Sequence, residues 1–374
     1  MKTYPVSLPS IGVEEENAVL AVLRSGHLSL GPKYQEFERA FAEMIGTKYA
    51  VAVSSGTAGL HLALIAAGVG PGDEVITSPF SFIASSNAIL YVGAKPVFVD
   101  IDPRTGNIDA SRIEAAITEK TKAILPVHIF GQMCDMTQVM EIATRHKLLV
   151  IEDACESVCA SQNGQKAGTF GQSAVFAFYP NKQMTTGEGG MLVTNDERVA
   201  KLCKSLANQG RADNLQWLDH ERLGYNYRLD EMSAALGIEQ LKKLPSFIAA
   251  RQQIAAWYEE AFAPYRNIIE TPMVAPGNVH TYFVYVVRLP EGMDRDETIL
   301  KLKEVGVMTK PYLPSIHLFS FYRETFGYQN GSFPISEEVS RRSIALPIYV
   351  GLTQEDIREI VARMMKVLQP HAAI

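Results

Sequence analysis

Residues 178–191 read Phe-Tyr-Pro-Asn-Lys-Gln-Met-Thr-Thr-Gly-Glu-Gly-Gly-Met, and the rest of the chain is organised around this stretch. Two short apolar runs, 173–178 and 191–194, enclose it and are typical of buried strands that end at turn residues. Lys182 is therefore predicted on a loop between strands, where the glycines that follow allow backbone conformations that are costly for other residues. Such a loop presents a side chain. The plainer interpretation of the stretch alone is a solvated lysine beside a flexible hairpin.

The length and composition of the chain indicate an ordered globular protein with a small-molecule partner. Its 374 residues exceed the usual size of a single core, so a large domain and a smaller one are expected. Apolar residues make up 47% and charged residues 20%, which argues against disorder. The formal charge of −6 offers no general attraction for nucleic acid or an anionic membrane.

The first residues and the cysteines bear on the cellular compartment. Residues 1–12 contain two prolines and no apolar segment of secretory type, and the sequence holds no uncharged apolar run long enough to span a bilayer. The cysteines at 134, 155, 159 and 203 lack paired CxxC spacing and suit buried thiols better than disulfides or a metal site. We therefore predict a cytoplasmic protein without a bound metal.

Short apolar strands alternate with helical segments through the first half of the chain. Strands are predicted at 49–53, 74–77, 96–99, 122–127 and 148–151. Helices are predicted at 13–24, up to Gly46, from Thr57, and at 82–91, 109–117 and 136–145. This pattern indicates a mostly parallel sheet covered by helices on both faces. Ligands of such sheets bind at the carboxyl ends of the strands, where the motifs described below lie.

The pattern becomes more helical after Leu229. Helices are predicted at 231–241, 247–262, 296–305 and 354–368, and a strand at 281–289. We place a domain boundary near Leu244 to Ser246. This predicts a large domain over residues 13–245, which holds the motifs, and a small C-terminal domain over 246–374 with residues 1–12 packed near it.

Three motifs follow predicted strands. Ser54-Ser55-Gly56-Thr57-Ala58 begins a helix, whose unpaired N–H groups and nearby glycine form a candidate phosphate seat. A plain helix cap is the alternative. Asp153 could hold a proton on a heteroaromatic nitrogen, or it could cap the next helix. Phe82 could stack on a flat ring, although an aromatic residue at helical spacing more often belongs to the core.

Together with Lys182, these motifs supply what pyridoxal 5'-phosphate requires. A lysine amine can condense with the aldehyde of the cofactor and, once an incoming amine has displaced it, can act as the general base. The cofactor provides the electron sink, while the protein provides orientation and electrostatics. A carboxylate such as that of Asp153 strengthens the sink by keeping the ring nitrogen protonated.

With these residues in view, the sequence resembles the DegT/StrS family of sugar aminotransferases nearly from end to end. The resemblance implies an α/β protein with the fold of aspartate aminotransferase (fold type I), in which a large domain with a mostly parallel seven-stranded sheet carries a smaller α+β C-terminal domain. The matching segments are Ser10-Ile11-Gly12, Leu30-Gly31-Pro32, Ser54-Ser55-Gly56-Thr57-Ala58, Gly70-Pro71-Gly72-Asp73-Glu74-Val75, Pro126-Val127-His128, Glu152-Asp153-Ala154, Thr185-Thr186-Gly187-Glu188-Gly189-Gly190 and Gly224-Tyr225-Asn226-Tyr227-Arg228.

The resemblance also implies roles for single residues. Lys182 is implied to be the lysine that binds the cofactor aldehyde, and Asp153 to pair with the pyridine nitrogen. Glu156 falls where the family has a residue near the ring hydroxyl, and Phe82 where an aromatic ring stacks on the cofactor. Asn226 matches an asparagine that reaches the phosphate from the neighbouring subunit, which implies a homodimer with shared active sites.

The phosphate seat shows one departure from the family. Gly56, Thr57 and Ala58 match the phosphate loop, but Ala177 stands where the family usually has a serine that contributes a hydroxyl. Loss of one neutral hydrogen bond costs about 1 kcal/mol, which a seat with several other donors can absorb. The departure therefore bears on the detail of phosphate binding and leaves the predicted cofactor unchanged.

The resemblance implies that L-glutamate donates an amino group to a nucleotide-linked 4-keto-6-deoxy sugar in cell-surface polysaccharide or amino-sugar biosynthesis. Arg228 is a candidate for gripping the donor carboxylate or the sugar diphosphate, with a structural ion pair as the alternative. Segment 310–318 resembles the sugar-side loop of perosamine synthetases, which places His317 near the hexose, although a lone loop histidine is more often incidental.

Two other functions stay open on the sequence alone. One is a regulatory protein that binds pyridoxal phosphate without turnover, since the family includes members described as regulators. The other is a dehydratase, but related dehydratases replace the lysine by histidine and some add cysteines for an iron–sulfur cluster. This chain keeps Lys182 and lacks that cysteine set, which favours transamination. His128 and Glu188 are shared with the family, and structural support explains both at least as well as chemistry.

Overall fold

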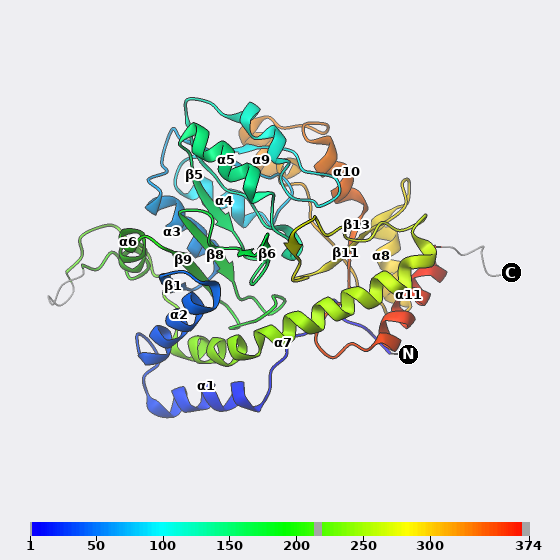
Figure 1. Ribbon diagram of the computed structural model, residues 1–374, viewed down its shortest axis with the longest axis horizontal. Coiled ribbons are helices and arrows are strands. Elements are labelled where there is room, and N and C mark those ends of the chain that lie inside the picture. Colours follow the sequence, from blue (N-terminus) through cyan, green and yellow to red (C-terminus); the bar gives the residue numbers. More distant parts are fainter. Residues whose placement is uncertain (1, 213–218, 369–374) are drawn as a thin grey trace.

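A computed structural model of the chain describes residues 2–212 and 219–368 (Figure 1). Its described residues form a central sheet of seven strands in the order β1-β9-β8-β5-β4-β2-β3. In this sheet β9 runs antiparallel to β1 and β8, and the other neighbours run parallel. The predicted large, mostly parallel sheet is confirmed. Its strands are β1 (Tyr49–Val53), β2 (Glu74–Thr77), β3 (Lys95–Phe98), β4 (Thr121–Ile124), β5 (Leu149–Asp153), β8 (Ser173–Ala177) and β9 (Gly190–Thr194).

Helices cover both faces of the central sheet because its strands are apolar on both sides. In β1, Ala50 and Ala52 belong to one core, and Val51 and Val53 belong to the other. Strands of this kind are what a sheet buried on both faces requires. The first core contains residues of α2 (Pro32–Ile45), α5 (Met136–His146) and the first half of α7 (Glu231–Phe262). The second contains residues of α3 (Gly56–Ala66), α4 (Ala84–Tyr91) and α6 (Glu197–Ala207).

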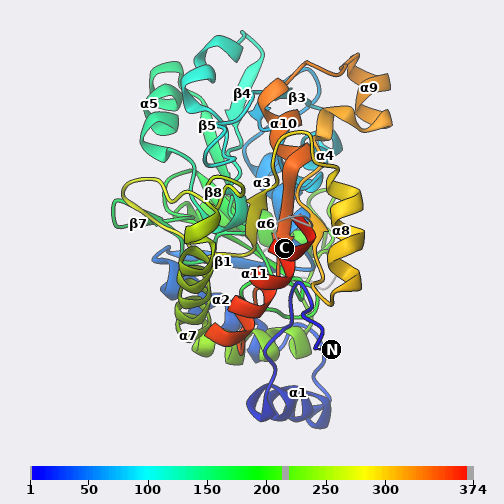
Figure 2. The same ribbon diagram turned by 90° about the vertical axis from the view of Figure 1, so that its right-hand side faces the viewer.

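A third core surrounds a small antiparallel sheet in the C-terminal part of the chain. Figure 2 shows two helices of this part, α8 (Arg295–Glu304) and α11 (Gln354–Leu368). Tyr4 belongs to this core and is fully buried, and its backbone N–H donates to the Gly306 carbonyl at 2.8 Å. The residues around Tyr4 therefore lie against the C-terminal part of the chain. The sheet consists of β11 (Tyr285–Arg288), β13 (Ser343–Leu346) and β12 (Lys310–Pro311), and the core adds residues of α8 (Arg295–Glu304), α11 (Gln354–Leu368) and the second half of α7.

Helix α7 joins the two parts of the molecule as one continuous helix of 32 residues, where the sequence predicted two helices (Figure 1). Pro245 lies inside it. Proline removes one intrahelical hydrogen bond, but here Leu244 and Phe247 on either side of it are buried, and their packing holds the helix together. The first half of α7 contributes to the core of the central sheet and the second half to the third core. The division into domains at residue 245 stays a prediction.

The remaining elements include several that the sequence did not predict. The predicted helix 109–117 is replaced by two single-turn helices, because only Ala110 and Ile113 of this segment are buried and a longer helix would have no apolar stripe to pack. Helices α6, α9 and α10 were missed. The further elements are α1 (Val13–Ser25), η1 (Ala110–Arg112), η2 (Glu114–Ala116), η3 (Ile129–Gly131), β6 (Ser161–Gln162), β7 (Gln165–Lys166), η4 (Ala263–Tyr265), β10 (Asn278–Val279), η5 (Ile316–Leu318), α9 (Ser320–Phe326) and α10 (Pro334–Arg342).

The state of the cysteines and the apolar character of the helices can be read from the structure. All four cysteines are free thiols, and Cys134 and Cys203 are buried. In the part of the chain that the structure describes, no helix is long and apolar enough to cross a membrane.

His280, which lies between β10 and β11, should make stability fall at acidic pH. Burial lowers the pKa of His280 to about 3, and its Nδ1 accepts the Tyr282 N–H at 2.9 Å, so the folded ring is neutral. An unfolded histidine titrates near pH ~6.5. Between these values only the unfolded chain binds the proton, so the free energy of unfolding falls as pH drops below about 6.5, by up to about 1.4 kcal/mol per pH unit.

Urea unfolding between pH 7.5 and 5.5 measures this effect. His280→Asn keeps an acceptor for the Tyr282 N–H but cannot titrate, so the pH dependence of its unfolding free energy should be shallower than that of the wild type. Equal slopes for the two proteins would contradict the assignment.

Candidate active site

The amino end of α3 meets the carboxyl ends of β5 and β8 at one edge of the central sheet. A methyl group built on Gly56 would lie 2.8 Å from both the Cys155 sulfur and Ala177 Cβ. Any larger residue at position 56 would collide with these atoms, so glycine permits the close approach. Asp153 ends β5, and Lys182 lies on the loop between β8 and β9. The structure therefore brings the predicted phosphate seat, carboxylate and lysine to one edge.

The beginning of α3 keeps unpaired N–H groups at this edge. The Ser55 hydroxyl accepts the Ala58 N–H at 3.1 Å and caps the helix. The N–H groups of Gly56 and Thr57 in the first turn have no partners within the helix. Gly190 lets β9 approach closely, since a methyl group there would lie 2.7 Å from the Gly56 nitrogen. The arrangement suits an anion, because helix N-termini combine free N–H groups with a partial positive charge.

Asp153 is held rigidly in a buried position and is 4% exposed. One carboxylate oxygen accepts the Ser85 hydroxyl at 2.7 Å, and the other accepts the Cys155 N–H at 3.1 Å. Ser85 lies at the start of α4, and its hydroxyl also lies 3.2 Å from the Phe82 carbonyl oxygen. The sequence analysis missed Ser85, although its place three residues after Phe82 in a helix was the available signal. Ser85 links the segment that carries Phe82 to Asp153.

The Lys182 amine lies between a carboxylate and an aromatic ring. Its Nζ is 3.6 Å from Glu156 Oε1 and 3.8 Å from the centre of the Phe283 ring. Glu156 is buried and also accepts the Phe130 N–H at 2.9 Å. Burial raises the pKa of the Glu156 carboxyl, and the charge of Lys182 opposes this rise. Lys182 is thus enclosed, with a side chain only 13% exposed, and the interpretation as a solvated surface lysine is wrong.

Phe283 reaches Lys182 through a close backbone contact between the two parts of the molecule. The Phe283 N–H donates to the Phe130 carbonyl, and the Thr281 N–H donates to the Gly131 carbonyl, both at 2.9 Å. A methyl group on Gly131 would lie 2.7 Å from the Tyr282 nitrogen, and the φ of Gly131 is 106°. Only glycine tolerates both conditions. This contact positions a residue of the C-terminal part against Lys182, and no sequence motif predicted it.

Comparisons with known proteins agree with this geometry. Residues 9–365 match the DegT/DnrJ/EryC1/StrS aminotransferase family. The chain belongs to that family. A GDP-perosamine synthase from Caulobacter vibrioides is 42% identical over 366 residues, which cover 97% of this chain and 98% of the relative.

Two solved structures superpose closely on this chain over nearly its whole length. Helicobacter pylori PseC, an aminotransferase involved in the biosynthesis of pseudoaminic acid, superposes with a TM-score of 0.93 at 28% identity, covering 99% of this chain and all of that one. S. venezuelae DesV, solved in complex with a ketimine intermediate, gives a TM-score of 0.91 at 33% identity over the full length of both chains. The fold predicted from the resemblance is confirmed.

Membership of the DegT aminotransferase family implies pyridoxal phosphate as the cofactor. The residues at this edge of the central sheet fit that cofactor. Lys182 offers an amine for the aldehyde, and the buried carboxylate of Asp153 offers a negative charge for the ring nitrogen. The first turn of α3 offers N–H groups for the phosphate, with no side chain at Gly56 to obstruct it. Ala177 beside Gly56 adds no hydroxyl to this seat.

Two residues of this chain that were predicted to contact the cofactor are exposed in the single chain. Phe82, just before α4, is 61% exposed and lies next to the segment that contacts Asp153. Asn226 is exposed, and its backbone pairs with that of Asn208 near the end of α6. Stacking by Phe82 and a phosphate contact by Asn226 stay predictions. Both side chains are accessible to a cofactor or to a neighbouring subunit.

The two predicted substrate residues do not contact Lys182 or Asp153 within the described chain. Arg228 donates to the Asn208 amide oxygen at 2.8 Å. His317 is fully buried, with its Nε2 2.9 Å from Glu337 Oε1. Burial lowers the pKa of His317, which Glu337 partly opposes. For both residues a substrate contact stays a prediction, and His317 would have to leave its buried position to make one.

His128 and Glu152, which belong to segments shared with the DegT family, form a buried network next to Asp153. Both are fully buried, and their Nε2 and Oε2 atoms lie 3.2 Å apart. His128 Nδ1 accepts the Cys134 N–H at 3.3 Å, so Nε2 carries the proton and donates to Glu152. Glu152 also accepts N–H groups at 2.8 to 2.9 Å from Gly168, Phe170 and Gly171. The network therefore gives His128 a structural role.

Replacing Glu152 by glutamine should destabilise the fold. The glutamine NH₂ group would have to face backbone N–H groups, leaving buried donors unpaired at a cost of about 3 kcal/mol. Urea unfolding of Glu152→Gln measures the loss, and Glu141→Gln, at an exposed position on α5, should change stability by less than about 0.5 kcal/mol. Equal stability of the two variants would show that the network contributes nothing.

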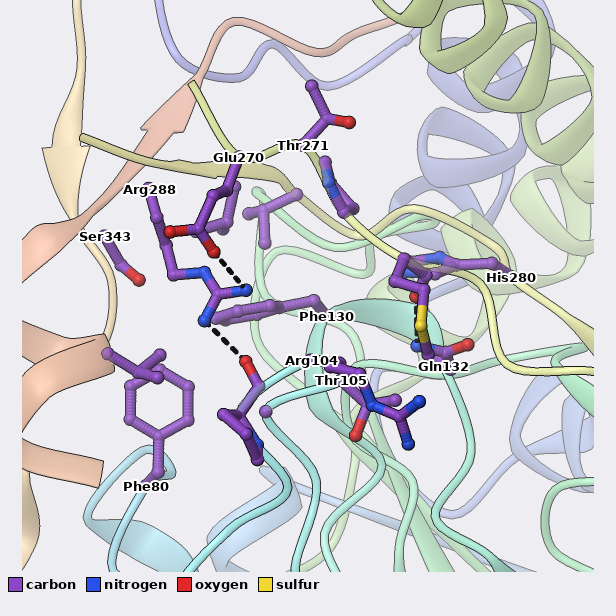
Figure 3. Close-up of a pocket in the computed structure, with 17 residues that line it drawn as sticks. Phe80, Arg104, Thr105, Phe130, Gln132, Glu270, Thr271, His280, Arg288 and Ser343 are labelled. Atoms are coloured by element: carbon purple, nitrogen blue, oxygen red, sulfur yellow. Dashed lines mark hydrogen bonds and ion pairs between the residues drawn. The ribbon is translucent and has the colours of Figure 1, made fainter. Parts of the chain in front are cut away.

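A small cavity of about 40 Å³ lies close to this site but is separate from it (Figure 3). Phe80, Phe130 and Arg288 are among its lining residues, whereas Lys182, Asp153 and Glu156 are not. Arg288 pairs with Glu270 at 2.8 Å, and Arg104 with Asp102 at 3.1 Å. The charges around the cavity are thus neutralised by the chain's own residues.

Proposed function

We propose that this chain is a pyridoxal phosphate-dependent sugar aminotransferase that moves the amino group of L-glutamate to a nucleotide-linked 4-keto-6-deoxy sugar. One observation carries the proposal. The enclosed amine of Lys182, 3.6 Å from Glu156, lies at the strand edge that also presents Asp153 and the amino end of α3. An amine, a buried carboxylate and an anion seat at one edge are the groups that this chemistry needs.

The residues at this edge of the sheet have separate roles in the proposed reaction. Bound pyridoxal phosphate supplies the electron sink. Lys182 Nζ accepts the proton from the amino donor and returns it, as a general base and then a general acid. Asp153 holds positive charge at the ring nitrogen, and Ser85 keeps its carboxylate oriented through the 2.7 Å hydrogen bond. Phe283 covers the Lys182 ammonium group and helps to exclude water.

The similarity to the GDP-perosamine synthase from Caulobacter vibrioides supports a GDP-linked sugar as the amine acceptor. The 40% identity to a spore coat polysaccharide biosynthesis protein from Bacillus subtilis supports polysaccharide biosynthesis as the context. We also propose a homodimer in which Asn226 and Arg228 reach the active site of the neighbouring subunit. The exposure of Asn226 in the single chain supports this assignment. Two subunits would then share each site.

Spectroscopy and product analysis test the function. Purified protein with pyridoxal phosphate should show an absorption band in the near-ultraviolet to visible range that bleaches when glutamate is added. GDP-, dTDP- and UDP-linked 4-keto-6-deoxyhexoses are then compared by release of 2-oxoglutarate and by transfer of ¹⁵N from labelled glutamate to the sugar.

Each other function gives a different result. A band that ignores glutamate would identify a regulatory protein that binds the cofactor without turnover. Loss of a sugar hydroxyl without transfer of ¹⁵N would identify a dehydratase. Amine transfer to the sugar is the expected outcome.

A further inference from the structure

His61 lies in the second turn of α3 and contacts the segment that carries Asn226. Its side chain is buried, and its Nδ1 lies 3.2 Å from the Tyr227 hydroxyl. The centre of the His61 ring is 4.7 Å from the ring centre of Tyr225 and 6.0 Å from that of Tyr227. The two tyrosine rings stack on each other, with their centres 5.1 Å apart. These contacts hold both tyrosine rings against α3.

Backbone pairing gives residues 225–227 an extended conformation. The Tyr227 N–H donates to the Ala207 carbonyl at 2.9 Å, and the backbone of Asn226 pairs with the chain just after α6. Successive side chains of an extended segment point to opposite sides. The two tyrosines point toward His61, so Asn226 between them points away from it, and its side chain is exposed. The direction of Asn226 is therefore set by the rings on either side of it.

The hydrogen bonding of His61 is incomplete. Its Nε2 is buried and, among the described residues, has no hydrogen-bond partner. Burial lowers the pKa of His61, so the ring is neutral at pH 7. Buried polar atoms are nearly always paired, and leaving one unpaired costs stability. A leucine at this position would avoid that cost but could not bond to the Tyr227 hydroxyl. The contact of Nδ1 with Tyr227 therefore gives a reason for an imidazole here.

We propose that His61 is a positioning residue that acts on the active site of the neighbouring subunit. By holding Tyr225 and Tyr227, it directs Asn226 toward the cofactor phosphate of that subunit. This inference rests on the proposed function, which assigns Asn226 to the neighbouring site. It can be told apart from simple support of α3, because the first turn of α3 belongs to the phosphate seat of the subunit that carries His61.

Titration of cofactor-free protein with pyridoxal phosphate measures the effect. His61→Leu and Tyr227→Phe should each weaken binding by about 3- to 10-fold, the range that one neutral hydrogen bond contributes. Binding of pyridoxal, which lacks the phosphate, should change by less than about twofold. In a protein that already carries Asn226→Ala, adding His61→Leu should cause no further loss, because the side chain that His61 positions is gone.

Hybrid dimers show which active site His61 serves. In the first hybrid, one subunit carries Lys182→Ala and the other carries His61→Leu, and two different affinity tags isolate the mixed dimer. The absorption band of bound pyridoxal phosphate then reports only the site with an intact lysine, which lies in the His61→Leu subunit. Asn226 at that site comes from the other subunit, in which His61 is unchanged. This hybrid should therefore bind with wild-type affinity.

The second hybrid joins a wild-type subunit to one that carries both Lys182→Ala and His61→Leu. Its intact lysine lies in the wild-type subunit, but Asn226 at that site comes from the altered one, so binding should weaken by the full 3- to 10-fold. His146→Leu is the matched control for both hybrids. His146 is an exposed histidine of α5, a helix on the other face of the central sheet, and its Nε2 contacts Glu114 at 2.7 Å. This substitution should leave the affinity unchanged.

Weakened binding in the first hybrid with wild-type binding in the second would show that His61 supports its own subunit, and the proposal would be overturned. An equal loss for pyridoxal and pyridoxal phosphate, or the absence of any mixed dimer, would overturn it as well. If His61→Leu does not fold, Tyr227→Phe replaces it in both hybrids, since it removes one oxygen atom and keeps the ring. Failure of the proposed function is distinguishable, because wild-type protein would then show no absorption band with pyridoxal phosphate.

Discussion

Replacing Lys182 by alanine is expected to lower the rate of amine transfer by at least about 10³-fold and to abolish the absorption band of the bound cofactor. General acid–base catalysis by a positioned side chain contributes about 10²- to 10⁴-fold, and the proposed function also assigns the covalent attachment of the cofactor to this lysine. The fold should survive, because the loop that carries Lys182 is held by other residues, such as Gln183, which donates to the Glu156 carbonyl at 2.6 Å. Circular dichroism checks this point.

Two controls sharpen the experiment on Lys182. Lys301→Ala removes a lysine of α8 whose side chain is 54% exposed and paired with Glu297, and it should leave the rate and the spectrum unchanged. Methylamine added to Lys182→Ala should restore part of the proton-transfer step, since a small amine can occupy the space of the lost side chain beside Glu156. Wild-type rates in Lys182→Ala would remove the central residue of the proposed mechanism.

Local sequence patterns predicted much of the central sheet. The strand at 49–53 and the helix at 354–368 have the predicted bounds, because each combines a clear apolar pattern with turn or cap residues at its ends. The continuity of α7 through Pro245 was not predictable in this way. It depends on buried neighbours such as Leu244, which pack against other parts of the chain and outweigh the local preference of proline.

The candidate site was predictable where a motif carried it and not where tertiary contacts complete it. Lys182 and Asp153 were identified from glycine-rich and strand-end patterns, and the structure places both at one edge of the sheet. Ser85 lies 68 residues before Asp153 in the sequence, and only its place three residues after Phe82 pointed to it. Phe283 lies even farther from Lys182 in the sequence, and no local pattern could assign it. His317 shows the converse, since its motif resembles a sugar-binding loop while its side chain is buried against Glu337.

Asp153→Asn is expected to lower the rate by about 10²- to 10³-fold while leaving the protein able to bind pyridoxal phosphate. Asparagine preserves the size of the side chain. Its amide oxygen can accept the Cys155 N–H while its NH₂ group donates to the Ser85 oxygen, so the position of the residue should change little. It carries no charge, and a carboxylate is what keeps the ring nitrogen protonated. The variant should therefore bind the cofactor, retain its absorption band, and react slowly with glutamate.

Ser85→Ala separates the charge of Asp153 from its orientation. This variant keeps the carboxylate and removes one hydrogen bond to it, so we expect a loss of about tenfold, equivalent to about 1.4 kcal/mol of transition-state stabilisation. Stopped-flow measurement of band bleaching by glutamate should rank the proteins as wild type, Ser85→Ala and Asp153→Asn in order of decreasing rate. If Asp153→Asn reacts as fast as Ser85→Ala, the charge contributes nothing beyond orientation, and the assignment of Asp153 to the ring nitrogen fails. A far slower Asp153→Asn with the cofactor still bound identifies the negative charge itself as the contribution of this residue, because position and size are then held constant.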